Sequence, residues 1–213
     1  MNYNAKINWW WNLYSILNKT IYELEVERSR FIGVIIHIDS IDEIKDIITN
    51  LKKEYPKAKH YCYAAITDNN KKFSDDGEPQ GTAGKPMLDI LEKKELTNVL
   101  VVVIRYFGGI LLGSGRLLRT YADTLLKTID NSEIVKIVEG YSITFTIDYP
   151  NYDNVRSYLK NQNAQIERAE FLDNVNVTTF SLNDYTQDLS NRFYGKVIIK
   201  NVSKKISYMK EGF

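Results

Sequence analysis

Strand and helix signals alternate along the whole chain and predict an α+β protein of two domains. Over residues 19–138, β-rich runs alternate with apolar stripes of helical period. Near Gly140 the pattern changes, and the order of signals becomes βαββαβ, which is typical of a ferredoxin-like domain. We therefore expect an N-terminal extension over residues 1–18, an α+β domain over residues 19–138 and a ferredoxin-like domain over residues 139–213.

The first domain begins with two extended segments and a helix. Residues 20–26 alternate with period two, and residues 31–38 are rich in β-branched side chains. Ser40 and Glu43 have the spacing of a capping box, in which each side chain satisfies a backbone N–H at a helix start. Pro56 ends the helix. The apolar stripe of this helix consists of Ile41, Ile44, Ile48, Leu51 and Tyr55.

Two more strands and two more helices complete the first domain. We expect strands over residues 60–67 and 98–106, the second of them continuously β-branched and so buried on both faces. Helices follow over residues 85–96 and from about Gly115 to Ile129. The expected buried face of the last helix is Leu118, Tyr121, Ala122, Leu125 and Ile129.

The second domain starts with a strand that has one solvent-facing side. Tyr141, Ile143, Phe145, Ile147 and Tyr149 alternate there with polar residues. The remaining expected elements are a helix over 152–162, strands over 165–173 and 175–183, a helix over 186–194 and a strand over 196–208.

Charge and composition exclude several classes of protein. The net charge is +1, with 19 basic and 19 acidic residues in 1–139 and 9 and 8 in the rest, so only a local patch can attract nucleic acid. Cys62 is the single cysteine, which rules out an intramolecular disulfide and fits a reducing compartment. No aliphatic run is long enough for a membrane span, and no signal peptide is recognised. We expect a cytoplasmic protein.

The N-terminal extension contains three consecutive tryptophans, Trp9 to Trp11. Its aromatic side chains either pack on the adjacent domain or contact a partner. The sequence carries no signal for an oligomeric state.

Two glycine-rich loops lie about twenty residues apart and suggest one site built from both. The Ser74–Pro86 loop holds three glycines, two prolines and three carboxylates in thirteen residues, and the Phe107–Gly115 loop leads into a helix. Glycines allow positive φ and close approach, whereas prolines stiffen the chain. The first-loop residues expected at the site are Asp75, Asp76, Glu78, Gln80, Gly81, Thr82 and Gly84.

The second loop has the arrangement of an anion site. A strand, a glycine-rich turn and a helix place free N–H groups and the positive end of the helix dipole toward a ligand. Arginines near the start of that helix are better tolerated beside a phosphate or carboxylate. The carboxylate can be internal, in which case the arginines form a structural network with the first loop. The expected anion contacts are Arg105, Gly108, Gly109, Gly113, Ser114, Gly115, Arg116 and Arg119.

Two common phosphate-binding motifs nearly match this loop and then fail. Gly108 and Gly113 have P-loop spacing, but Ser114-Gly115 stands where Lys-Ser/Thr is required. A dinucleotide fingerprint would need a third glycine where Leu118 stands. We therefore exclude a P-loop nucleoside triphosphatase and a Rossmann domain.

Catalytic and metal sites have weak support. Asp75, Asp76 and Glu78 are oxygen donors suited to Mg²⁺, but no partner carboxylate occurs elsewhere in the pattern. His60 and Cys62 share one strand face without a recognisable orienting group. We assign no catalytic residue, no metal and no cofactor, and favour a binding protein over an enzyme. A hydrolase acting on a small phosphorylated substrate stays as an alternative, with these three carboxylates and His60 as candidate bases.

Several motifs, in order, resemble the IMPACT/YigZ family. They are Ser29-Arg-Phe-Ile32, His60-Tyr-Cys-Tyr-Ala64, the Ser74–Pro86 loop, Thr97-Asn-Val99 and Arg105–Gly115. The resemblance implies a ribosomal-protein-like α+β fold for the first domain. It also implies a C-terminal domain similar to the last domain of elongation factor G. One position departs from the family pattern, since Arg116 stands where a second glycine usually follows Gly115.

The resemblance also implies a role in translation. Eukaryotic members of the family bind a large activator protein and restrain a stress kinase, and bacterial members are proposed to bind nucleic acid or ribosomes. Our leading hypothesis is a translation regulator that binds RNA or the ribosome through the two loops. A second alternative, besides the hydrolase, is a regulator that binds a protein partner and whose loops are purely structural.

Overall fold

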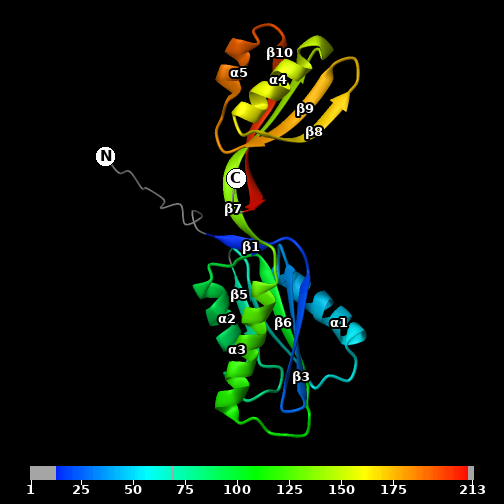
Figure 1. The fold of residues 1–213 in the computed structure, drawn as a ribbon, viewed down its shortest axis with the longest axis vertical. Helices are drawn as coiled ribbons and strands as arrows, with labels where there is room; N and C mark the ends of the chain where they lie inside the picture. Colours follow the sequence, from blue (N-terminus) through cyan, green and yellow to red (C-terminus); the bar gives the residue numbers. More distant parts are fainter. Residues whose placement is uncertain (1–12, 69, 211–213) are drawn as a thin grey trace, which may run out of the picture. The chain divides into compact units, whose positions relative to one another are not determined.

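The computed structural model describes residues 13–68 and 70–210, so Trp9–Trp11 lie outside the described part of the chain. The chain divides into two compact units (Figure 1). Unit 1 consists of the chain up to Lys136 and the segment that begins at Met209. Unit 2 is Ile137–Tyr208.

Unit 1 is built on a five-stranded sheet whose neighbouring strands are all antiparallel. One edge strand, β5, is missing from the sequence prediction because it is only four residues long and mostly exposed. The strands in spatial order are β2 (Thr20–Val26), β3 (Ser29–His37), β6 (Val99–Tyr106), β4 (His60–Ile66) and β5 (Lys71–Ser74).

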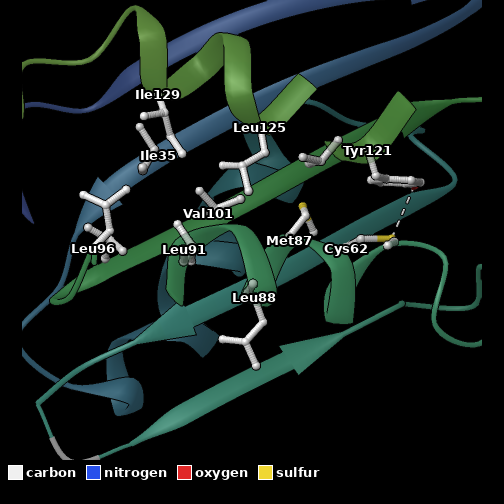
Figure 2. Packing of buried hydrophobic residues seen from close by; sticks show 14 of the residues in the cluster. Ile35, Cys62, Met87, Leu88, Leu91, Leu96, Val101, Tyr121, Leu125 and Ile129 are labelled. Atoms are coloured by element: carbon white, nitrogen blue, oxygen red, sulfur yellow. Dashed lines mark hydrogen bonds between the residues drawn. The ribbon is translucent and has the colours of Figure 1, made fainter. Parts of the chain in front are cut away.

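Helices cover both faces of this sheet (Figure 1). On one face, Val99, Val101 and Val103 of β6 pack with α2 (Gly84–Lys93) and α3 (Ser114–Asp130), as Figure 2 shows around Val101. On the other face, the alternate residues of β6 pack with α1 (Ile44–Glu54). The prediction of a strand buried on both faces is confirmed. Each buried aliphatic side chain of this kind stabilises the fold by about 1.5–3 kcal/mol.

The start of α1 follows the predicted capping box. Ser40 accepts a hydrogen bond from the Asp42 backbone, and the Glu43 carboxylate accepts one from the Ser40 N–H at 2.8 Å. The first turn, η2 (Ile41–Glu43), is a 3₁₀ helix that continues directly into α1.

The buried face of α3 differs from the prediction at two residues. Ala122 is only partly buried. Leu118 is 38% exposed, whereas its neighbour Leu117 is buried. The buried stripe also includes three threonines that sequence patterning counts as polar. Their hydroxyls bond to backbone carbonyls one turn earlier, which makes burial inexpensive. These residues are Thr120, Thr124 and Thr128.

Unit 2 has the predicted βαββαβ order, with α4 and α5 packed on one face of its sheet. In spatial order the strands are β10, β7, β9 and β8. The elements along the chain are β7 (Ile134–Ile147), α4 (Tyr149–Asn161), β8 (Gln165–Phe171), β9 (Val175–Ser181), α5 (Thr186–Arg192) and β10 (Val197–Lys210).

Part of the expected N-terminal extension forms a strand. β1 (Tyr14–Ile16) pairs antiparallel with the first three residues of β7, and Ile16 is fully buried in the core of unit 1. Residues 134–136 of β7, which pair with β1, belong to unit 1, and the strand continues without a break past residue 138.

Candidate functional site

The Ser74–Pro86 loop opens with a tight turn. Asp76 and Gly77 both have positive φ, 40° and 83°, and the Glu78 N–H donates to the Asp75 carbonyl at 2.9 Å. Positive φ at both central residues defines a type I′ turn, for which Asp-Gly is a favoured pair. The turn directs Glu78 inward, where its side chain is only 3% exposed.

Asp75 organises the rest of this loop. Its carboxylate accepts backbone hydrogen bonds from Gly81 at 2.8 Å, Ala83 at 3.0 Å and Gly84 at 2.8 Å. It therefore caps the start of α2 from nine residues upstream in the sequence. A negative charge is favoured at the start of a helix. The Thr82 hydroxyl donates to the Pro79 carbonyl at 2.6 Å, and Gln80 is exposed. These contacts give the loop its shape.

Asp76 joins the loop to the sheet. Its carboxylate accepts a hydrogen bond from the Tyr61 N–H at 2.6 Å, and its carbonyl lies 2.8 Å from Nδ1 of His60. Both partners belong to the start of β4. Asp76 is thus engaged by backbone and imidazole contacts within unit 1.

Glu78 is the centre of a buried polar cluster, which we define as His60, Cys62, Glu78, Arg105 and Tyr121. Its Oε1 accepts from Arg105 Nη1 at 2.6 Å and from the Tyr121 hydroxyl at 2.8 Å, and lies 3.9 Å from His60 Nε2. The Cys62 thiol donates to the Asp75 carbonyl at 2.9 Å and lies 3.3 Å from the Tyr121 hydroxyl (Figure 2).

Burial controls the ionisation of the two weak acids in this cluster. It raises the pKa of the Cys62 thiol, and the neighbouring carboxylates raise that pKa further. Burial, Cys62 and Glu78 likewise raise the pKa of Tyr121. Since the thiolate is the reactive form, Cys62 is poorly suited to be a nucleophile.

The hydrolase alternative and the magnesium site find little support in this geometry. Asp75, Asp76 and Glu78 all accept internal hydrogen bonds, so none of the three points freely toward a substrate. Among residues 13–68 and 70–210, no group of three or more His, Cys, Asp or Glu side chains is arranged to hold a metal ion.

Arg105 differs from its expected role as a surface anion contact. It is 5% exposed and paired with Glu78, and its Nε is buried with no partner in the described part of the chain. The expected internal network is therefore present for this one arginine. Its guanidinium also lies over the rings of Phe31 and Phe107, at 5.2 and 5.5 Å.

The Phe107–Gly115 loop lies against the turn between β2 and β3. Gly108 packs so closely on the Arg28 backbone that a Cβ atom would overlap it, and its N–H donates to the Ser29 hydroxyl at 3.1 Å. Gly109 and Gly113 have positive φ, 86° and 72°. This approach brings the hairpin tip beside the loop.

Three exposed arginines lie at this place, and we call Arg28, Arg116 and Arg119 the arginine surface. Arg116 pairs with Glu27 at 2.7 Å, with both side chains well exposed. The side chains of Arg28 and Arg119 have no hydrogen-bond or ion-pair partner within the described residues. Arg28 was absent from the prediction because only the fold brings the hairpin to the loop.

The start of α3 has unused hydrogen-bonding capacity beside this surface. Among the described residues, no side chain forms a capping hydrogen bond at this helix start, and the first turn, which includes Ser114 and Gly115, contains no acidic residue. The first turn of a helix has backbone N–H groups without helical partners and carries the positive end of the dipole.

The same loop exposes apolar side chains. Leu111 is 88% exposed, and Phe107 and Ile110 are each 39% exposed, as is Leu118 of the adjoining α3 at 38%. The Phe107 ring lies under Lys59 Nζ at 5.2 Å, so it is partly covered rather than buried in the core.

The fold and these loops define a two-domain α+β protein with a ferredoxin-like C-terminal part. A family model for the Impact N-terminal domain matches residues 27–129. An IMPACT family member of Haemophilus influenzae is 32% identical over 84% of this chain and 92% of its own length. IMPACT family member YigZ of Escherichia coli is 43% identical over 69% of this chain and 74% of its own length. The chain belongs to the IMPACT family.

A solved structure supports the fold over nearly the whole chain. The crystal structure of a hypothetical protein has a TM-score of 0.57 at 26% identity and covers 93% of this chain and 98% of its own. Mammalian relatives match over a shorter stretch. Protein IMPACT of Rattus norvegicus, for example, is 35% identical over 42% of this chain and 30% of its own length. Within the described residues, no helix has both the length and the apolar character needed to cross a membrane.

Proposed function

We propose that this protein is a cytoplasmic regulator of translation that acts by binding RNA or the ribosome. The contact is the arginine surface together with the start of α3. Membership in the IMPACT family supports the link to translation. The resemblance implies translational regulation by eukaryotic members, and bacterial members are proposed to bind nucleic acid or ribosomes.

The observation that carries the proposal is the concentration of unneutralised positive charge at one helix start. Arg28 and Arg119 have no partner within the described residues, and the first turn of α3 has no acidic side chain. Exposed arginines of this kind fork onto phosphate oxygens, and a helix start adds backbone donors. The phosphate oxygens of a nucleic acid can accept hydrogen bonds from both the arginines and the backbone N–H groups.

The Arg116–Glu27 pair does not prevent this use of Arg116. Its side chains are 50% and 38% exposed. Pairs this exposed stabilise a protein by only about 0–1 kcal/mol, so Arg116 can exchange Glu27 for a phosphate at little cost. The small net charge of the chain makes such a local patch the expected route to nucleic acid.

The test compares two double variants that remove the same amount of charge. Arg116→Ala with Arg119→Ala removes two of the three arginines of the arginine surface, and Lys45→Ala with Lys53→Ala removes two exposed lysines of α1. We expect the first variant to bind a single-stranded RNA oligonucleotide and purified bacterial ribosomes about tenfold or more weakly at low salt. The lysine variant is expected to match the wild type. Equal affinities for all three proteins would overturn the proposal, as would no binding by the wild type.

A second candidate function is binding to a protein partner on the ribosome, and it is supported by the exposed leucine at the loop tip. Leu111 is 88% exposed beside Ile110, and an apolar side chain at the surface contributes little to phosphate binding but suits a protein partner. In that case Leu111→Ser would abolish ribosome sedimentation while leaving the affinity for the RNA oligonucleotide unchanged. If Leu111→Ser sediments with ribosomes like the wild type, this candidate is eliminated.

A further inference from the structure

Unit 2 contains a groove whose lining residues all belong to that unit. It has a volume of about 540 Å³ and lies between α4 and the segment that follows α5. Cavities of about 300–1,000 Å³ are typical of sites for small molecules. Its lining is mostly polar, which indicates a ligand with hydrogen-bonding groups.

The floor of the groove is aromatic and fixed in place. Tyr158 is 4% exposed and meets the Phe193 ring edge-on, with 5.8 Å between centroids. The Tyr158 hydroxyl donates to the Asp188 carboxylate at 2.6 Å. The Asp188 carboxylate is therefore occupied by the Tyr158 hydroxyl, and the Arg192 guanidinium lies over the Tyr158 ring at 5.6 Å.

Two cations line the groove without an acidic partner. Neither Arg192 nor Lys196 forms an ion pair with any carboxylate in the described part of the chain. Within residues 13–68 and 70–210, Lys196 Nζ donates to Asn151 Oδ1 alone, at 3.3 Å, and the Asn151 amide in turn donates to Asp148. An amide thus holds the lysine, and no described carboxylate is within ion-pair distance of its Nζ, which leaves room for an anionic group in the groove.

The rim of the groove presents a tyrosine to solvent. Phe193 to Lys196 form a tight turn in which the Lys196 N–H donates to the Phe193 carbonyl at 2.9 Å and Gly195 has a φ of 72°. Tyr194 occupies the tip and is 88% exposed, although tyrosine usually buries most of its ring. Across the groove, the amides of Asn154 and Asn161 have no partner among the described residues.

We infer that this groove binds one nucleotide. The base stacks on Tyr194, the Asn154 and Asn161 amides donate to and accept from its edge, and Arg192 with Lys196 contact the phosphate. Aromatic stacking together with basic side chains is the general chemistry of single-stranded nucleic-acid sites. The same chemistry serves a free nucleoside monophosphate and one nucleotide of a single-stranded RNA. The inference goes beyond the proposed function because its residues belong to a different unit.

The opposite side of α4 supplies a natural control. A second groove there is lined by Arg156 and Lys160, but also by Asp153, and it has no aromatic residue. It holds the same pair of basic residue types as the first groove. Replacing Arg156 and Lys160 by alanine therefore matches the charge change of Arg192→Ala with Lys196→Ala.

The test follows backbone amide shifts of the full chain during titration with AMP, with UMP and with an eight-nucleotide single-stranded RNA. We expect shifts to concentrate at residues 151–161 and 192–197. Tyr194→Ala should weaken binding about tenfold, as expected for the loss of one stacked base. Arg192→Ala with Lys196→Ala should abolish the shifts, whereas Arg156→Ala with Lys160→Ala should preserve them.

The two nucleotide sources are separated by the same titrations. Saturation by AMP or UMP at concentrations similar to those of the oligonucleotide assigns the groove to free nucleotides, and much tighter binding of the oligonucleotide assigns it to RNA. Shifts confined to residues 107–119 would overturn the inference while supporting the arginine surface. The inference is also overturned if the groove shows no shifts at millimolar nucleotide, or if a hexaglutamate peptide binds there more tightly than either nucleotide.

Discussion

Arg105 and Arg116 lie eleven residues apart, yet their environments are opposite. Arg105 pairs with Glu78 at 2.6 Å, with side chains 6% and 3% exposed, and Arg116 pairs with Glu27 at 2.7 Å, with side chains 50% and 38% exposed. The distances are nearly equal. The difference in burial makes the first pair part of the folded core and leaves the second available to a ligand.

The most severe test of this comparison removes one acid from each pair. Glu78→Gln is expected to lower the free energy of unfolding by about 3–5 kcal/mol, because Arg105 would keep its charge in a buried site without a counter-ion. Glu27→Gln is expected to cost less than about 1 kcal/mol. Urea unfolding followed by circular dichroism measures both. Similar losses in the two variants would contradict the division between a structural and an exposed pair.

A second test compares a glycine that packs against a neighbouring backbone with a glycine that has open space around it. Gly108→Ala should destabilise the protein by about 1–3 kcal/mol, since the added methyl group must displace the Arg28 backbone. Gly115→Ala meets no atom within 4 Å, lies inside α3 and should be neutral or stabilising by up to about 1 kcal/mol. Thermal denaturation of the two variants gives the comparison. A neutral Gly108→Ala would show that the loop and the hairpin tip are not held together.

The sequence predicted the elements better than it predicted the site. The capping box at Ser40, the doubly buried β6 and the βαββαβ order all depend on local patterns, which periodicity and spacing reveal. The burial of Arg105 depends on Glu78, 27 residues away, and the capping of α2 depends on Asp75, outside any local capping motif. Such pairings form only when the sheet brings distant segments together, so residue spacing alone does not show them.

A third, smaller effect concerns the pH dependence of the buried cluster. The pKa of Cys62 is raised above its ordinary value of 9.0, so the folded thiol keeps its proton while the unfolded chain loses it above about pH 9. This contribution to stability is present below that pH and is lost as the pH rises. In the wild type, this effect makes the free energy of unfolding fall as the pH rises above 9. We expect that fall to be smaller in Cys62→Ala, by up to about 1.4 kcal/mol per pH unit.

The measurement compares urea unfolding of Cys62→Ala and wild type between pH 7.5 and pH 10. Tyr121, whose pKa is also raised, acts in the same direction. Burial, the largest cause of that shift, is kept in Cys62→Ala, so the folded state of both proteins holds the Tyr121 proton up to pH 10 and its contribution largely cancels in the difference. Parallel pH profiles for the two proteins would show that the Cys62 thiol is not protected from ionisation.

The exposed arginines should leave stability unchanged and alter binding alone. For Arg116→Ala with Arg119→Ala we expect a change in unfolding free energy of less than about 1 kcal/mol, because both side chains are exposed. A larger loss would place these arginines in the same structural class as Arg105.

The most direct test of the central claim is the salt dependence of RNA affinity. Log affinity for a single-stranded RNA is measured against log salt concentration for the wild type, the double arginine variant and the Lys45→Ala, Lys53→Ala control. Each lost phosphate contact should reduce the slope by roughly 0.7, so the arginine variant is expected to show a slope shallower by about 1.4. The control should keep the wild-type slope. Three identical slopes would contradict phosphate binding at the arginine surface.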